Sequence, residues 1–156
     1  MIHDVHDLYL VSLRRTLEAV RVVPPIPDGE VVDDGMRDVL ADAQAAARVQ
    51  AARLEAAYVA AGGAWAEGAV PDAVVGASAA ALSPPVHANI DARTQAVAAA
   101  GVVYASVLGG RFAVLGAWAG ALGFADHADG LLDSAAEARD LASTFARWLA
   151  DATGPA

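Results

Sequence analysis

The chain has 156 residues, the size of one domain that can bury a core, and residues 1–156 are treated as a single domain. Its formal charge of -9 makes nucleic acid and anionic membrane surfaces unfavourable partners. There is no Cys, which excludes disulfides, thiolate metal sites and a cysteine nucleophile. Ala accounts for 41 residues, and Val seldom alternates with polar residues as in a half-buried strand, so the composition predicts an all-α fold.

No exported or membrane-spanning segment is predicted. Asp4 stands where a signal peptide would carry basic residues. The longest uncharged, mostly apolar stretch covers residues 94–110 and ends at Arg111, so it is shorter than the roughly 20 residues that a membrane span needs. A helix enclosed by other helices has the same pattern. We therefore expect a cytoplasmic protein that does not bind membranes.

Four long helices are predicted, at residues 4–23, 33–61, 88–122 and 125–152. Pro24-Pro25 ends the first helix, Gly62-Gly63 the second and Gly123 the third. Because four long helices with short apolar repeats bury their faces best against one another, the pattern predicts a four-helix bundle.

The third predicted helix and the connection before it are less regular than the rest. Gly and Pro interrupt the connection, where we expect one short extra helix at residues 72–82. The third helix has almost no polar face, and bends are expected at Gly101 and Gly109-Gly110. The fourth helix has the clearest pattern, with apolar residues every three or four positions from Leu131 to Leu149.

Several short strings resemble the ferritin-like family of YciE/YciF-type stress proteins. Residues 7–9 (Asp-Leu-Tyr) are similar to the Asp-Leu-Phe of the family's first helix, and residues 53–55 (Arg-Leu-Glu) to the string that closes its second helix. Residues 107–116 align without a gap with its Val-Glu-His-Tyr-Glu-Ile-Ala-Ala-Tyr-Gly, and residues 122–132 resemble its last turn and last helix. The resemblance covers nearly the whole chain and implies a ferritin-like bundle with a stress-related role.

The resemblance also implies where metal ligands have been lost. The family builds a two-metal site from Glu and Glu-x-x-His ligands that project into the bundle. The matching positions of this chain are Val20, Ala43, Ala46, Leu108, Gly109, Arg111 and, for the last Glu, Ala138 or Arg139. Side chains of Val, Ala and Leu offer no electron pair to a hard cation. The resemblance therefore implies a degenerate metal site and no cofactor, with iron held by other ligands as the alternative.

The carboxylates and histidines themselves lead to the same expectation. No Glu-x-x-His tetrapeptide occurs, and the four His fall near helix ends or in loops. Of the five Glu, Glu18, Glu55 and Glu137 fall on polar stripes, and Glu30 and Glu67 fall in connections. We therefore expect an apolar, metal-free interior.

Two clusters near helix starts have residues that can bind cations. His3 and His6, flanked by Asp4 and Asp7, have a spacing compatible with a helical metal pair. The second cluster comprises Asp126, His127, Asp129 and Asp133. Acidic residues in a first helical turn are also favoured by the helix dipole, so a solvated surface role is the simpler interpretation of both clusters.

Arg111 interrupts an otherwise uncharged segment. If it points inward, its guanidinium needs an acid or an anion, because burying it unpaired is costly. One hypothesis places it in part of the vacated metal site, as a ligand or ion-pair residue. The simpler hypothesis lets it reach the surface or a subunit interface.

Gly116 and Gly120, with small neighbours, let two helix backbones approach closely. The contact is either internal to the bundle or a seam between two copies, and we expect a homodimer because the third helix has so little polar surface.

No catalytic residue is assigned. The chain has no Gly-x-Ser-x-Gly elbow, no phosphate-binding Gly loop and no dinucleotide fingerprint. The leading hypothesis is a non-enzymatic, metal-free dimeric scaffold or binding module. One alternative is a di-metal iron protein with oxidase or iron-handling activity. The other is a binder of a small amphipathic ligand in the bundle core beside Arg111.

Overall fold

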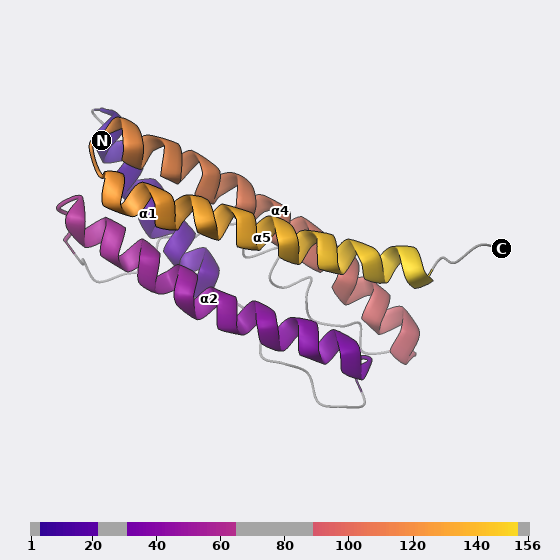
Figure 1. Cartoon of the computed structure of the whole chain (residues 1–156). Helices are drawn as coiled ribbons and strands as arrows, with labels where there is room; N and C mark the ends of the chain where they lie inside the picture. Colours follow the sequence, from indigo (N-terminus) through magenta and orange to yellow (C-terminus); the bar gives the residue numbers. More distant parts are fainter. Residues whose placement is uncertain (1–3, 22–30, 65–88, 153–156) are drawn as a thin grey trace.

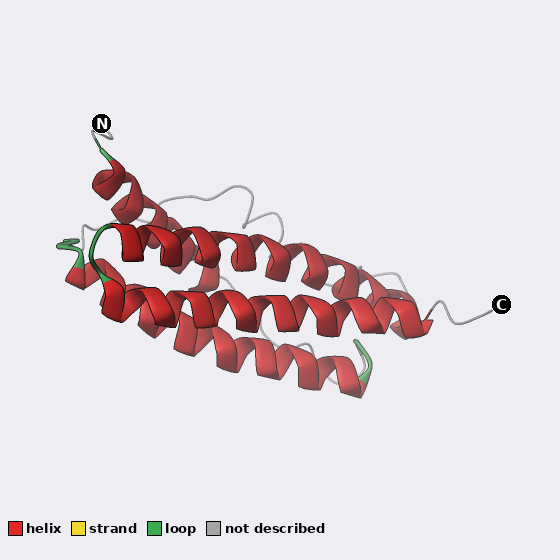
Figure 2. Ribbon diagram, turned by 45° about the horizontal axis from the view of Figure 1, so that its top comes forward, coloured by secondary structure: helices red, strands yellow, loops and turns green. Residues whose placement is uncertain are grey.

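The computed structural model describes residues 4–21, 31–64 and 89–152, and among them it contains four helices and no strand. The helices are α1 (Val5–Arg21), α2 (Asp34–Ala60), α4 (Ile90–Ala121) and α5 (Ala125–Ala152). They pack along one another as an all-helical bundle (Figure 1). Figure 2 shows the same arrangement from a second direction, with helix in every long element. The all-α prediction is confirmed.

The helix ends follow local signals. The Asp33 carboxylate caps α2 by accepting a hydrogen bond from the Gly35 N–H at 2.8 Å, and the Asn89 side chain caps α4 in the same way. Gly123 lies in the turn between α4 and α5 and has a φ of +87°, a conformation that costs Gly little. The observed ends lie within two residues of the predicted ones. The short helix predicted at 72–82 lies outside the described residues.

Glycines of α4 admit the close approach of α5, the partner on which α4 packs most extensively. An ideal Cβ on Gly101 would lie 2.6 Å from the Phe145 ring, and one on Gly116 would lie 2.7 Å from Leu132 Cγ. The helix continues unbroken through Gly101 and Gly109-Gly110, where bends were expected. Gly101 and Gly116 therefore serve helix packing, and none of the glycines named here interrupts α4.

Gly116 and Gly120 have different surroundings although they are four residues apart on α4. Gly116 packs against α5, whereas the Cβ direction of Gly120 has no described atom within 4 Å. The internal contact therefore accounts for Gly116, and a seam between two copies at Gly120 stays a prediction.

One hydrophobic core joins the four helices. Its largest fully buried side chains are Tyr9, Leu13, Leu17, Met36, Leu54, Phe112, Leu115, Leu131 and Phe145. The predicted apolar face of the first helix is thus inward, except that Val5 at its start is exposed. Burial of these faces stabilises the bundle without any need for a metal.

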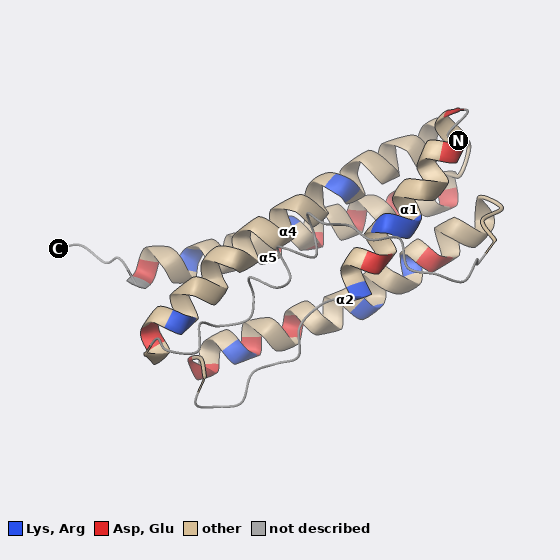
Figure 3. Ribbon diagram, turned by 180° about the vertical axis from the view of Figure 1, so that it is seen from behind, with Lys and Arg blue, Asp and Glu red and all other residues tan. Residues whose placement is uncertain are grey.

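Charged residues are sparse along α4 (Figure 3). Among the described helices, α4 alone is long and apolar enough to cross a membrane by length and composition, and 44% of its most apolar window is buried in the bundle. A helix enclosed in a protein core has the same properties.

Tyr9 carries a hydroxyl that the core does not satisfy. Its ring is fully buried and stacks on Phe124, and its hydroxyl makes no hydrogen bond to any described residue. Burial raises the pKa of Tyr9 to about 12 and raises the pKa of Tyr104 as well.

We predict that Tyr9→Phe raises the free energy of unfolding by about 1 kcal/mol, because it removes an unsatisfied buried polar group. Above about pH 10 the unfolded state loses tyrosine protons that the native state retains, so stability falls as pH rises, and it falls less in Tyr9→Phe. Urea unfolding at neutral and alkaline pH measures both effects. The control is Tyr58→Phe, which loses the hydrogen bond that the Tyr58 hydroxyl donates to the Ala64 carbonyl and should lower stability. A destabilised Tyr9→Phe variant would contradict the prediction.

Candidate functional site

A cleft of about 430 Å³ runs between α1 and α4. It is lined by Ser12, Arg15 and Thr16 of α1 and by Ser106, Val107, Gly110, Arg111, Val114, Leu115 and Trp118 of α4. We call it the α1–α4 cleft. Its volume falls in the range of small-molecule sites, roughly 300–1,000 Å³.

Helical periodicity brings these residues to one side of each helix. On α4 they recur every three or four positions, beginning at Ser106 and ending at Trp118, and so form a stripe along the helix. α1 runs antiparallel to this stripe. Near the end of α1 the Tyr104 hydroxyl donates a hydrogen bond to the Ala19 carbonyl at 3.4 Å, and near its start Tyr9 stacks on Phe124 beyond the end of α4.

The charged residues in the described lining of the cleft are basic, although the chain as a whole is acidic. Arg15 and Arg111 both line it, and no described lining residue is acidic. Arg15 is exposed, whereas Arg111 is half-buried and its Nη1 nitrogen is fully buried. Both guanidinium groups are charged at any physiological pH and offer planar donor pairs that fit a carboxylate.

Three hydroxyl groups add further donors to the α1–α4 cleft, from Ser12, Thr16 and Ser106. The Thr16 hydroxyl donates to the Ser12 carbonyl at 2.8 Å. No histidine or carboxylate occurs among the described lining residues, so neither serine has a general base beside it there. The arrangement can bind an anion but has no activated nucleophile.

Most positions that match lost family ligands lie inside the bundle. Val20, Ala43, Leu108 and Ala138 are buried, and Gly109 is buried with its Cβ direction 3.6 Å from Ala138 Cβ. Ala46 is half-buried. Arg111 differs from the others because its side chain lines the α1–α4 cleft. None of these side chains offers an electron pair to a cation, because Arg111 carries a protonated guanidinium and the others are apolar.

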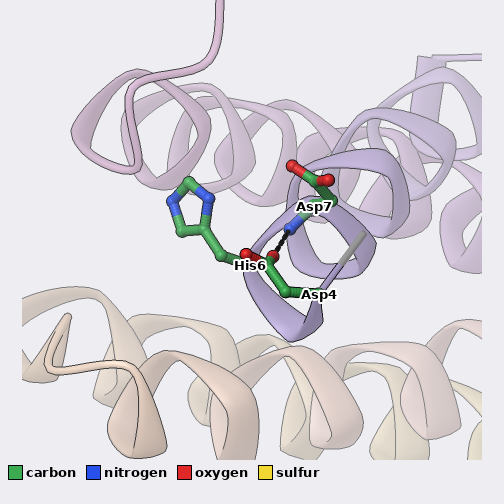
Figure 4. Close-up of side chains that lie close together, drawn as sticks. All are labelled: Asp4, His6 and Asp7. Carbon is green, nitrogen blue, oxygen red and sulfur yellow. Dashed lines mark hydrogen bonds between the residues drawn. The ribbon is translucent and has the colours of Figure 1, made fainter. Parts of the chain in front are cut away.

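The start of α1 gathers Asp4, His6 and Asp7, whose ligand atoms lie within 4.8 Å of one another (Figure 4). His3 lies outside the described residues. The Asp4 carboxylate accepts a hydrogen bond from the Asp7 N–H at 2.9 Å, and the His6 Nε2–H donates to the Ala61 carbonyl at 2.9 Å. Capping of α1 and attachment to the end of α2 account for these contacts.

The second predicted cation cluster lies at the start of α5. Asp126, Asp129 and Asp133 are exposed, and His127 is half-buried. His127 borders an open hollow together with the ion-paired Arg21 and Glu55. In the described part of the chain, these Asp residues do not group with His127 closely enough to hold an ion.

A polar network between α2 and α5 was not predicted. Arg53 Nη1 donates to Glu137 Oε1 at 2.8 Å and to Ser134 Oγ at 3.0 Å, and Gln50 Nε2 lies 3.4 Å from Glu137 Oε2. Glu137 is 37% exposed, and its carboxylate also contacts α2, which its expected place on a polar stripe did not predict. The buried Gln50 was the available signal, since a buried amide requires hydrogen-bonding partners.

Comparison of the chain with protein-family models, with curated proteins and with solved structures found no match. The resemblance to YciE/YciF-type stress proteins therefore stays a prediction that rests on the short strings quoted above.

Proposed function

We propose that the chain is a non-enzymatic helical binding module and that it binds a small anionic molecule in the α1–α4 cleft. The observation that carries the proposal is the pairing of Arg15 and Arg111 in a cleft without a described acidic lining residue, in a chain of net charge -9. Two arginine side chains in one cleft attract an anionic ligand and repel a cationic one. Among the described lining residues no base lies beside Ser12 or Ser106, which favours binding over catalysis.

Titration calorimetry with sulfate and with octanoate, at constant ionic strength, tests this function. We expect at least one anion to bind and Arg111→Gln to weaken it about tenfold or more, because a hydrogen bond to a charged group is lost. Octyltrimethylammonium, which carries the opposite charge on the same tail, should bind at least about tenfold more weakly than octanoate.

Two glycine variants separate a cleft ligand from a ligand bound elsewhere. Gly110 lines the cleft and its Cβ direction is open, so Gly110→Leu should fill the site and abolish binding. Gly120 is equally open but lies outside the cleft, so Gly120→Leu should leave binding unchanged. Binding that survives both Arg111→Gln and Gly110→Leu, or no binding of either anion, would contradict the proposal.

We further propose that the bundle is a divergent, metal-free ferritin-like one, on the strength of the family resemblance and of the buried Val20, Ala43, Leu108 and Ala138. The resemblance adds a stress-related role. Metal content per chain, measured before and after incubation with ferrous iron, zinc and manganese, tests this part of the proposal. We expect no retained metal. About two retained metals per chain would restore the iron-handling alternative.

A homodimer remains part of the proposal. Val103 is 54% exposed on α4, and the neighbouring exposed residues on that side, Ala99 and Ser106, are small and uncharged. A second copy of the chain would cover this surface without desolvating a charge.

A further inference from the structure

We infer that the ligand of the α1–α4 cleft is an amphipathic monoanion, a carboxylate carrying an unbranched apolar tail. This inference rests on the proposed function and adds the class of ligand. It follows from the order in which polar and apolar residues occur along the cleft.

The polar groups gather at one end. Along α4, Ser106 and Arg111 belong to the first half of the lining, with Val107 and Gly110 between them. The antiparallel course of α1 brings Arg15 and Thr16 toward the same end. The guanidinium groups and the Ser106 hydroxyl are the donors for one carboxylate, since the Thr16 hydroxyl donates to the Ser12 carbonyl. Arg binds a planar carboxylate through two parallel hydrogen bonds.

The other end is apolar. Beyond Arg111, the residues of α4 that line the cleft are Val114, Leu115 and Trp118, and only Ser12 of α1 adds a polar group there. Trp118 follows Arg111 by seven positions, which places them about 10 Å apart along the helix axis. An inorganic anion would leave this wall uncovered, whereas a medium-length acyl chain with its carboxylate at Arg111 would cover it.

Val114 offers a variant that affects the tail alone. It is 47% exposed and lies in the apolar half of the cleft, so Val114→Asn changes the wall without opening the core. Val49 of α2 is 49% exposed and lies outside the cleft, so Val49→Asn is a matched control.

The test compares octanoate, acetate and sulfate by calorimetry on the full chain, at octanoate concentrations too low for micelles. We expect octanoate to bind at least about tenfold more tightly than acetate, since its tail buries several more methylene groups. Val114→Asn should weaken octanoate about fivefold and leave acetate unchanged, because only the longer ligand reaches that wall. Val49→Asn should change neither affinity.

The outcomes separate this inference from the proposed function. Equal affinity for acetate and octanoate, both lowered by Arg111→Gln, would overturn the amphipathic ligand and keep an anion-binding module. Tighter binding of octanoate that Val114→Asn does not weaken would also overturn it, because the tail would then lie elsewhere. If no anion binds, both proposals fail.

Discussion

Replacing Gly101 with Val is expected to lower the free energy of unfolding by about 2–3 kcal/mol, because the new side chain overpacks the α4–α5 contact. The Phe145 ring occupies the space that a Cβ would take, at 2.6 Å from it, and the ring is itself fully buried. α4 and α5 cannot move apart without losing the contacts that surround Gly101 and Phe145. Urea unfolding followed by circular dichroism measures the change.

The control for this variant is Gly120→Val, on the same helix but with no described atom within 4 Å of its Cβ direction. It should be neutral or slightly stabilising, because Val has a better helix propensity than Gly. Combining Gly101→Val with Phe145→Ala should cost less than the sum of the two single changes, since the smaller side chain makes room. Additive losses would show that Gly101 and Phe145 do not compete for the same space.

Glu137→Ala is expected to cost about 2 kcal/mol, because it leaves Arg53 and the buried Gln50 without their shared acceptor. The Arg53 and Glu137 side chains are 29% and 37% exposed, so solvent compensates for part of the loss. Glu137→Gln, which retains one acceptor oxygen, should lie between Ala and the natural residue. Chemical unfolding of the three proteins measures the series.

Glu55 provides the comparison on the surface. Its ion pair with Arg21 joins two side chains that are each 45% exposed, and Glu55→Ala should change stability by less than about 0.5 kcal/mol. A loss at Glu55 as large as that at Glu137 would mean that the α2–α5 network contributes no more than an ordinary surface pair.

Helix bounds were predictable because their signals are local. α5 begins and ends at the predicted residues 125 and 152, since its apolar residues recur every three or four positions and Gly123 precedes it. α2 begins at Asp34, one residue after the predicted start, directly behind the cap at Asp33. Each of these features is decided by residues within one or two turns of the helix.

The direction of each face of α4 could not be predicted, because its residues are apolar nearly all round. A bend was expected at Gly101 and a close helix contact at Gly116, and only the position of α5 shows that these glycines accept Phe145 and Leu132. The α1–α4 cleft could not be predicted either, because it also depends on how the helices pack. Arg111 was recognised as unusual, but Ser12, Arg15 and Thr16 join it only through the antiparallel packing of α1, which no local pattern encodes.

The short turn between α4 and α5 has a consequence for how the chain folds. Three residues, 122–124, connect the two longest helices, and these two helices also share the most extensive packing. Contacts across α1 and α4 are far more distant in sequence, as with the 85 residues between Ala19 and Tyr104. Closing a short loop costs less entropy than closing a long one, so the helical hairpin of the C-terminal half forms first. The N-terminal half, although synthesised earlier, acquires its place only when that hairpin presents a surface on which to dock.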